Sequence, residues 1–228
     1  MMLRHIGLAL LVIGGAFNCQ NGKASSSPQR YSNSVAQTDM LKDLGRALSS
    51  THDAGRLYYS SNCSSAAGDI IPFPAVVAIP APGSTDSLDT IQHMFRENSD
   101  VVVTRAKRGL ISVEIGYTAN AVLKTKIHLM DFSPLQQFNP LLAIGAIENT
   151  KEMQGAMRML GVHQILRVAA YALVPPANGW PHLPTSVPNL NADQLLDLVA
   201  TTFKGIVVYG ACTPPSLIDI HFVQITNQ

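Results

Sequence analysis

Residues 55–63 read GRLYYSSNC, and residues 204–212 read KGIVVYGAC. Each stretch is a run of strand-forming residues that ends in a cysteine, and each follows a segment whose apolar residues have helical spacing. A further extended stretch follows each cysteine, so the order helix, strand and strand occurs twice. This order predicts an α+β fold in which small sheets pack against helices, with two related halves as a hypothesis.

Length and composition indicate a folded chain with little net charge. The protein has 228 residues, of which 46% are apolar and 14% are charged. That is enough apolar material for a packed core. The formal net charge is +1, so no strong electrostatic field favours nucleic acid, and we expect no nucleic-acid partner.

The first residues are typical of an export signal. MMLRH gives a positive start, and the apolar run IGLALLVIGGAF is too short to cross a bilayer comfortably. We therefore predict a signal peptide over residues 1–18 and a flexible tether over residues 19–37. Cys19 offers an alternative, a lipid anchor, although Phe17 and Asn18 replace the small residues that a lipoprotein signal prefers. The expected location is the periplasm or cell envelope, with membrane contact only through this N-terminal segment.

Export makes the cysteine count informative. The chain has three cysteines, and setting Cys19 aside leaves Cys63 and Cys212. An even pair in an oxidising compartment predicts a disulfide. The alternative is two separate buried thiols. The absence of a CxxC or Cys/His pattern gives no indication of a metal site.

The apolar periodicity divides the rest of the chain into two α+β units. The first unit spans residues 38–116 and closes with a hairpin, VVVT and LISVEI joined by RAKRG. The second unit spans residues 122–225 and ends with the second copy of the helix, strand and strand order. Residues 162–174 are ambiguous, and their flanking prolines favour a strand.

Two stretches of the first unit resemble a known family. DMLKDLGRALSSTHDAGRLYYSS (39–61) and AVVAIPAPGSTDSLDTIQHMFRENSDVVVTRAKRGLISVEI (75–115) are similar in their order of elements to the short N-terminal (STN) domain of secretins and TonB-dependent transducers. The resemblance implies a small periplasmic α+β module that contacts partner proteins. It covers about a third of the chain and brings no catalytic motif.

Candidate site residues are few. The sequence contains no nucleophile elbow, zinc-protease, phosphate-loop or dinucleotide motif, so we predict no catalytic residue, metal or cofactor. Asp219 and His221 point to one face of the last strand, where they could orient an imidazole or hold a metal, although the alternation predicts a solvated face. Trp180, in a proline-rich loop, can anchor a partner or cap the core. Glu148 and Glu152 are expected on a solvated helical face.

These observations favour an exported envelope protein that acts as a protein-interaction or structural module with an unknown envelope partner. If a sheet edge is open, addition of a partner strand is the most economical binding mode. The alternative is a secreted hydrolase whose serine or histidine site is assembled only in three dimensions.

Overall fold

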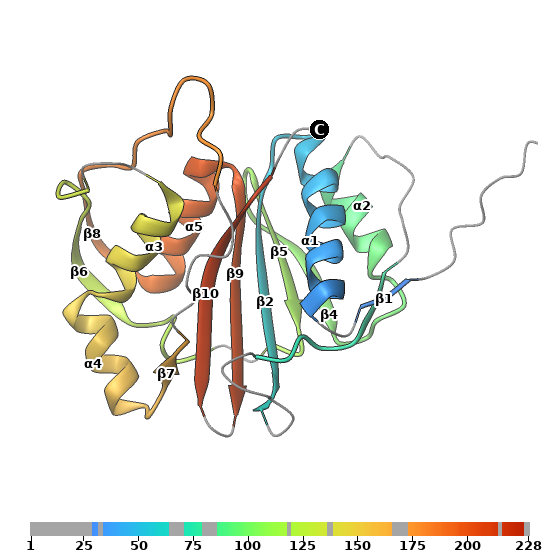
Figure 1. Ribbon diagram of the computed structural model, residues 1–228, viewed down its shortest axis with the longest axis horizontal. Helices are drawn as coiled ribbons and strands as arrows, with labels where there is room; N and C mark the ends of the chain where they lie inside the picture. Colours follow the sequence, from blue (N-terminus) through green and yellow to red (C-terminus); the bar gives the residue numbers. More distant parts are fainter. Residues whose placement is uncertain are drawn as a thin grey trace, which may run out of the picture.

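The computed structural model describes residues 29–31, 34–63, 71–78, 86–117, 120–135, 139–165, 173–213 and 216–225. Within these ranges the fold is α+β, as predicted. A mixed six-stranded sheet lies between two groups of helices (Figure 1). One group contains α1 (Ser34–Ser49) and α2 (Ser87–Met94). The other contains α3 (Pro140–Glu148), α4 (Lys151–Met159) and α5 (Ala192–Phe203).

The main sheet has the strand order β4, β5, β2, β9, β10 and β7. These strands are β4 (Val101–Lys107), β5 (Leu110–Ile115), β2 (Ala54–Asn62), β9 (Gly205–Thr213), β10 (Leu217–Gln224) and β7 (His163–Gln164). Two small antiparallel pairs accompany it. They are β1 (Gln29–Tyr31) with β3 (Val76–Ala78), and β6 (Lys126–Asp131) with β8 (Ser186–Asn191).

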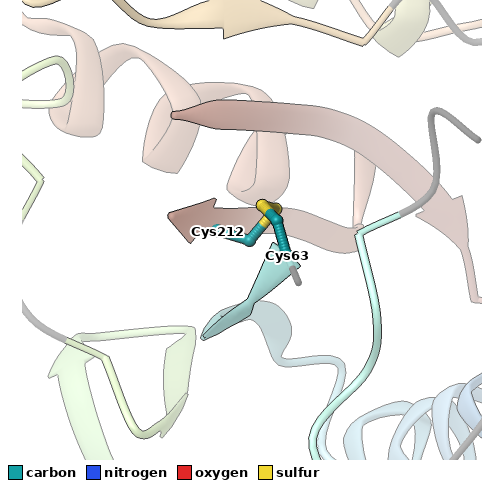
Figure 2. Close-up of a disulfide and its surroundings, with 2 residues drawn as sticks. All are labelled: Cys63 and Cys212. Carbon is teal, nitrogen blue, oxygen red and sulfur yellow. A yellow bond between two sulfur atoms is a disulfide. The ribbon is translucent and has the colours of Figure 1, made fainter. Parts of the chain in front are cut away.

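The two cysteine-ended stretches form the centre of this sheet. β2 and β9 are parallel neighbours (Figure 1). In their register, Tyr58 lies opposite Tyr209. Cys63 and Cys212 form a disulfide with their Cα atoms 5.3 Å apart (Figure 2). The predicted disulfide is therefore confirmed, and it indicates an oxidising compartment outside the cytoplasm.

Side-chain alternation along the central strands builds one core on each face of the sheet. In β2, Leu57 and Tyr59 pack with α1 and α2, whereas Tyr58 packs on the face covered by α3, α4 and α5. In β9, Val208 and Tyr209 divide between the faces in the same way. Because helices cover both faces, residues of either parity along a central strand are buried.

The predicted repeat holds only in part. α1 precedes β2 and α5 precedes β9, and the two helices lie on opposite faces of the sheet. The second strand of each copy behaves differently, because β10 pairs with β9 whereas β3 leaves the main sheet and pairs with β1. Strands from residues 38–116 and 122–225 nevertheless join in one sheet, so the two predicted units share their central layer.

The N-terminal predictions are tested only at their end. The signal segment 1–18 and Cys19 lie outside the described residues. The predicted tether over 19–37 includes residues that belong to regular structure, because β1 forms at 29–31 and α1 begins at Ser34. In the described part of the chain, every helix is too short or too polar to cross a bilayer. Of the stretch 162–174, only His163–Gln164 is seen as strand, and residues 166–172 lie outside the described ranges.

Candidate functional site

A cavity lies at the carboxyl end of β5, beside the N-terminus of α5. β2 and β5 are neighbouring parallel strands, and the chain continues from them to opposite faces of the sheet. From β2 it continues to α2 on one face of the sheet, and from β5 it continues to α3 and α5 on the other. In open sheets with parallel strands, such a change of direction at the carboxyl ends is the usual place for a ligand. The topology therefore marks this cavity as the candidate site.

The side chain of Arg56 lines the cavity and is the centre of a hydrogen-bond and ion-pair network. Its Nε donates to Oγ of Ser112 at 2.8 Å, and Nη1 lies 3.3 Å from carboxylate oxygens of both Asp193 and Asp197. Nη2 faces Glu114 at 3.6 Å, beyond hydrogen-bond range. Only 15% of the Arg56 side chain is exposed. One guanidinium thus links β2, β5 and α5, and one of its nitrogens has no hydrogen bond to the described residues.

The network sets the ionisation of its members. Burial works to lower the pKa of Arg56, but nearby Tyr58 and the three carboxylates outweigh it, so the pKa is raised. Burial raises the pKa of Asp197, with Arg56 opposing the rise. The hydroxyl of Tyr58 donates to Asp193 at 2.6 Å, and burial followed by that carboxylate raises the tyrosine pKa well above its usual value. Tyr58 and Arg56 therefore stay protonated.

Three tyrosines form the aromatic wall. The rings of Tyr58 and Tyr117 lie 5.3 Å apart, and Tyr209 contacts both, with centroid distances of 5.6 and 6.3 Å. Burial raises the pKa of Tyr209, with a smaller opposing effect from Asn120. Tyr117 is half-buried, and its hydroxyl accepts the N–H of Asn120 at 3.1 Å, which fixes the ring at the mouth.

The helix start presents polar groups to the same space. Asn191 caps α5 by accepting the N–H of Gln194 at 2.8 Å, in a reciprocal capping box. Asn191, Asp193, Lys124 and Glu114 line the cavity, which has a volume of about 300 Å³. The lining therefore combines donors, acceptors and tyrosine rings, which is suited to binding a small polar molecule.

The predicted candidates Asp219 and His221 lie elsewhere, on the sheet face that packs against α1 and α2. Their side chains share one face of β10, as predicted, and Nδ1 of His221 donates to Oδ2 of Asp219 at 3.0 Å. The prediction of a solvated face was wrong, because Asp219 is 1% exposed and His221 is 7% exposed. A pair this deeply buried is out of reach of a macromolecular partner.

Glu148 also departs from its prediction. It ends α3 and is buried, whereas Glu152 belongs to the separate helix α4 and hydrogen bonds to exposed His128. Burial raises the pKa of Glu148 to about 7, with a hydrogen bond to Gln164 opposing the rise. A shared solvated face for the two glutamates is therefore wrong. The helix break at Asn149 turns one carboxylate into the protein and the other out of it.

Trp180 caps the edge of a core. Its indole is partly buried and meets the ring of Phe203 edge-on at 5.9 Å, at the end of α5. Of the two roles considered for this residue, the structural one matches its position.

Catalytic and metal constellations do not emerge in the described ranges. His221 hydrogen bonds to Asp219 and to no described serine, threonine or cysteine side chain. Within these ranges, no three histidine, cysteine, aspartate or glutamate side chains are grouped closely enough to hold a metal ion.

No family model, curated protein or solved structure matches this chain. The sequence analysis did not predict the Arg56 network, because a single charged residue in a strand usually indicates the solvent-exposed face of that strand. The available signal was the contrast between Arg56 and the apolar, aromatic residues that follow it in GRLYY.

Proposed function

We propose that this chain is an exported protein of the bacterial envelope that binds a partner protein by accepting an extended segment at the outer edge of β4. The observation that carries the proposal is the position of β4 at the end of the main sheet. Its seven residues are mostly exposed, and no described strand pairs with its outer side. This agrees with the role that the STN resemblance implies.

Backbone geometry supports strand addition at this edge. Gly116 donates its N–H to the carbonyl of Asp100 at 3.0 Å, so every second residue from Asp100 onward bonds to β5. Val103 therefore directs its N–H and C=O outward. Gln92 confirms this orientation, since its side-chain amide donates to the Val103 carbonyl at 3.2 Å. The outward N–H of Val103 is the group that an added strand would use.

Charge narrows the class of partner. The end of β4 and its turn carry Arg105, Lys107 and Arg108. Arg105 lies 2.9 Å from Asp86, and Lys107 lies 3.9 Å from Asp197. Arg108 is exposed and has no ion pair among the described residues. Basic residues at a sheet edge discourage pairing with most strands, but they attract a strand that carries negative charge. The occupant we propose is therefore an extended segment with an acidic side chain close to Arg108, in the turn after β4.

The test compares two variants at one position. Val103→Pro deletes the outward N–H and leaves the bonds to β5 in place, whereas Val103→Ala shortens the side chain and keeps the N–H. Both variants and the wild-type chain carry a photo-crosslinker at Thr104 and are expressed in the native envelope. We expect the wild type and Val103→Ala to crosslink to one acidic segment and Val103→Pro to lose it. Equal crosslinking by Val103→Pro would refute strand addition.

The proposal also covers the compartment and the form of the mature N-terminus. We place the mature chain in the periplasm, either released after residues 1–18 or anchored through a lipid on Cys19. Mass spectrometry of the mature N-terminus distinguishes the two routes. Cytoplasmic recovery of an uncleaved chain with reduced Cys63 and Cys212 would contradict both.

A further inference from the structure

We propose that the cavity beside Arg56 and Tyr117 binds a neutral sugar ring, a function separate from the β4 edge. Its volume of about 300 Å³ is at the small end of ligand pockets, which run from about 300 to about 1,000 Å³. A cavity of this size suits one six-membered ring with its substituents. Its place at the carboxyl end of β5 and the start of α5 is independent of what pairs with β4.

The charge of the lining argues for a neutral ligand. Arg56 and Lys124 supply two positive charges, and Glu114 and Asp193 supply two negative ones. The guanidinium already lies 3.3 Å from Asp193 and 3.6 Å from Glu114. A cationic ligand would compete with Arg56 for these carboxylates, and an anionic ligand would add to the three carboxylates around it. A neutral molecule leaves the ion pairs intact.

The hydrogen-bonding groups argue for hydroxyls. Arg56 Nη2 and the Lys124 ammonium are donors without a hydrogen bond to the described residues. Asn191 uses its side-chain oxygen on Gln194, which leaves its NH₂ as a further donor. Glu114 and Asp193 are acceptors at the same cavity. Hydroxyl groups both donate and accept, so a polyhydroxylated ring satisfies this mixture, whereas an ammonium only donates and a carboxylate only accepts.

The tyrosines supply the apolar contact that such a ring needs. Tyr117 is held in place by Tyr58 at 5.3 Å and by Tyr209 at 6.3 Å. The C–H groups on one side of a pyranose are weakly positive and pack against the negative face of an aromatic ring. A fixed ring also loses little conformational entropy on binding. Tyr117 therefore acts as the platform, and the charged and amide groups contact the hydroxyls.

The experiment uses the purified mature chain with its disulfide formed. Methyl glycosides of glucose, galactose, mannose and N-acetylglucosamine are titrated at millimolar concentration, with choline and acetate as charged comparators. Binding is followed by amide chemical shifts and by calorimetry. We expect at least one glycoside to bind and to shift amides of β5, of residues 120–124 and of the start of α5. We expect neither charged comparator to do so.

Variants separate the site from a nonspecific effect. Tyr117→Ala should lower affinity at least about tenfold, because it removes the platform. Tyr117→Phe keeps the ring but loses the hydrogen bond from Asn120, so its affinity should lie between those of wild type and Tyr117→Ala. Asn191→Asp preserves the helix cap, deletes one donor and adds a charge, so it should also weaken binding. Leu142→Ala, an exposed α3 position outside the cavity, is the matched control.

Circular dichroism first shows that each variant is folded, and each binding result then either supports or overturns the proposal. Saturable glycoside binding that Tyr117→Ala weakens at least about tenfold and Leu142→Ala leaves intact supports the proposal. Failure of all four glycosides to bind overturns it, as does tighter binding of choline or acetate in the cavity. Glycoside binding whose affinity is the same in Tyr117→Ala as in wild type overturns it too, because the contact then lies elsewhere. None of these results depends on the fate of the β4 edge.

Discussion

Nη1 of Arg56 lies 3.3 Å from Oδ1 of Asp193, although the two residues are 137 positions apart in the chain. The pair connects β2 to the first turn of α5. Arg56 also reaches Asp197, which is only 13% exposed, so the link belongs to a largely desolvated network. Such networks contribute little net stability when complete, but breaking one by removing a single partner is costly.

Arg56→Met should therefore destabilise the fold strongly. The change takes the nearest cation away from Asp193 and Asp197 and leaves only Lys107, 3.9 Å from Asp197. The expected loss in the free energy of unfolding is about 3 kcal/mol, the low end for a buried pair, because Asp193 is 33% exposed. Chemical denaturation at neutral pH measures it. Arg96→Met, at an exposed α2-end position without an ion pair among the described residues, should change stability by less than about 0.5 kcal/mol. Equal effects of the two changes would show that the network is not formed.

Glu148 should give stability a distinctive pH dependence. Its pKa rises from 4.5 to about 7 on folding, so between these values the folded state holds more protons than the unfolded state. The free energy of unfolding then falls as pH rises through this window, by about 3 kcal/mol in total. Glu148→Gln should remove this fall and be more stable than wild type above pH 7. Denaturation midpoints across the window measure both effects.

The control for that experiment is Glu152→Gln. This carboxylate is partly exposed, and its pKa is lowered by hydrogen bonds from its own backbone N–H and from His128. The variant should therefore keep the downward slope of wild type. A slope that persists in Glu148→Gln would assign the titration to another group.

Two glycine-to-alanine substitutions should change the free energy of unfolding in opposite directions. A Cβ at Gly210 in β9 would lie 2.5 Å from the ring of fully buried Tyr59, so Gly210→Ala should cost about 1–3 kcal/mol. A Cβ at Gly155 in α4 meets nothing within 4 Å, and Gly155→Ala should gain about 0.5–1 kcal/mol from helix propensity. Thermal melting of both variants tests the packing of the sheet and of the helix separately. A neutral Gly210→Ala would contradict the close approach of Tyr59.

Removing the disulfide should lower stability without changing the fold. The double variant Cys63→Ala/Cys212→Ala opens a link between residues 149 positions apart, and the expected loss is about 2–5 kcal/mol. Wild type treated with reductant should melt close to the double variant. Thiol labelling of unfolded, unreduced wild type should detect neither cysteine, and reactive thiols at both would refute the link.

The sequence predicted the parts of this structure that depend on parity and local pattern. The disulfide followed from two cysteines left in an exported chain, and the hairpin of β4 and β5 followed from alternation around a basic turn. Asp219 and His221 were correctly assigned to one face of β10. Whether that face is wet depends on what covers it, and alternation carries no information about a layer contributed by distant helices.

The cavity was missed for a related reason. Its walls come from β2, β5, the segment around Asn120 and the start of α5, which are distant in sequence. Each polar residue there has an ordinary local explanation. Asn191, for example, reads as a helix cap, which it is. Only the parallel pairing of β2 with both β5 and β9 brings these groups together, and parallel pairing between distant segments has no signature in a single strand.

The position of β2 also has a consequence for biogenesis. Both of its neighbours, β5 and β9, are synthesised after it, and β9 begins only at Gly205. A nascent polypeptide thus holds the aromatic residues Tyr58 and Tyr59 without their final surroundings until β9 has emerged. Such late closure slows folding and calls for a holding chaperone. The disulfide between Cys63 and Cys212 can form only after residue 212 has been synthesised, so its oxidation reports that the central pair of strands has been assembled.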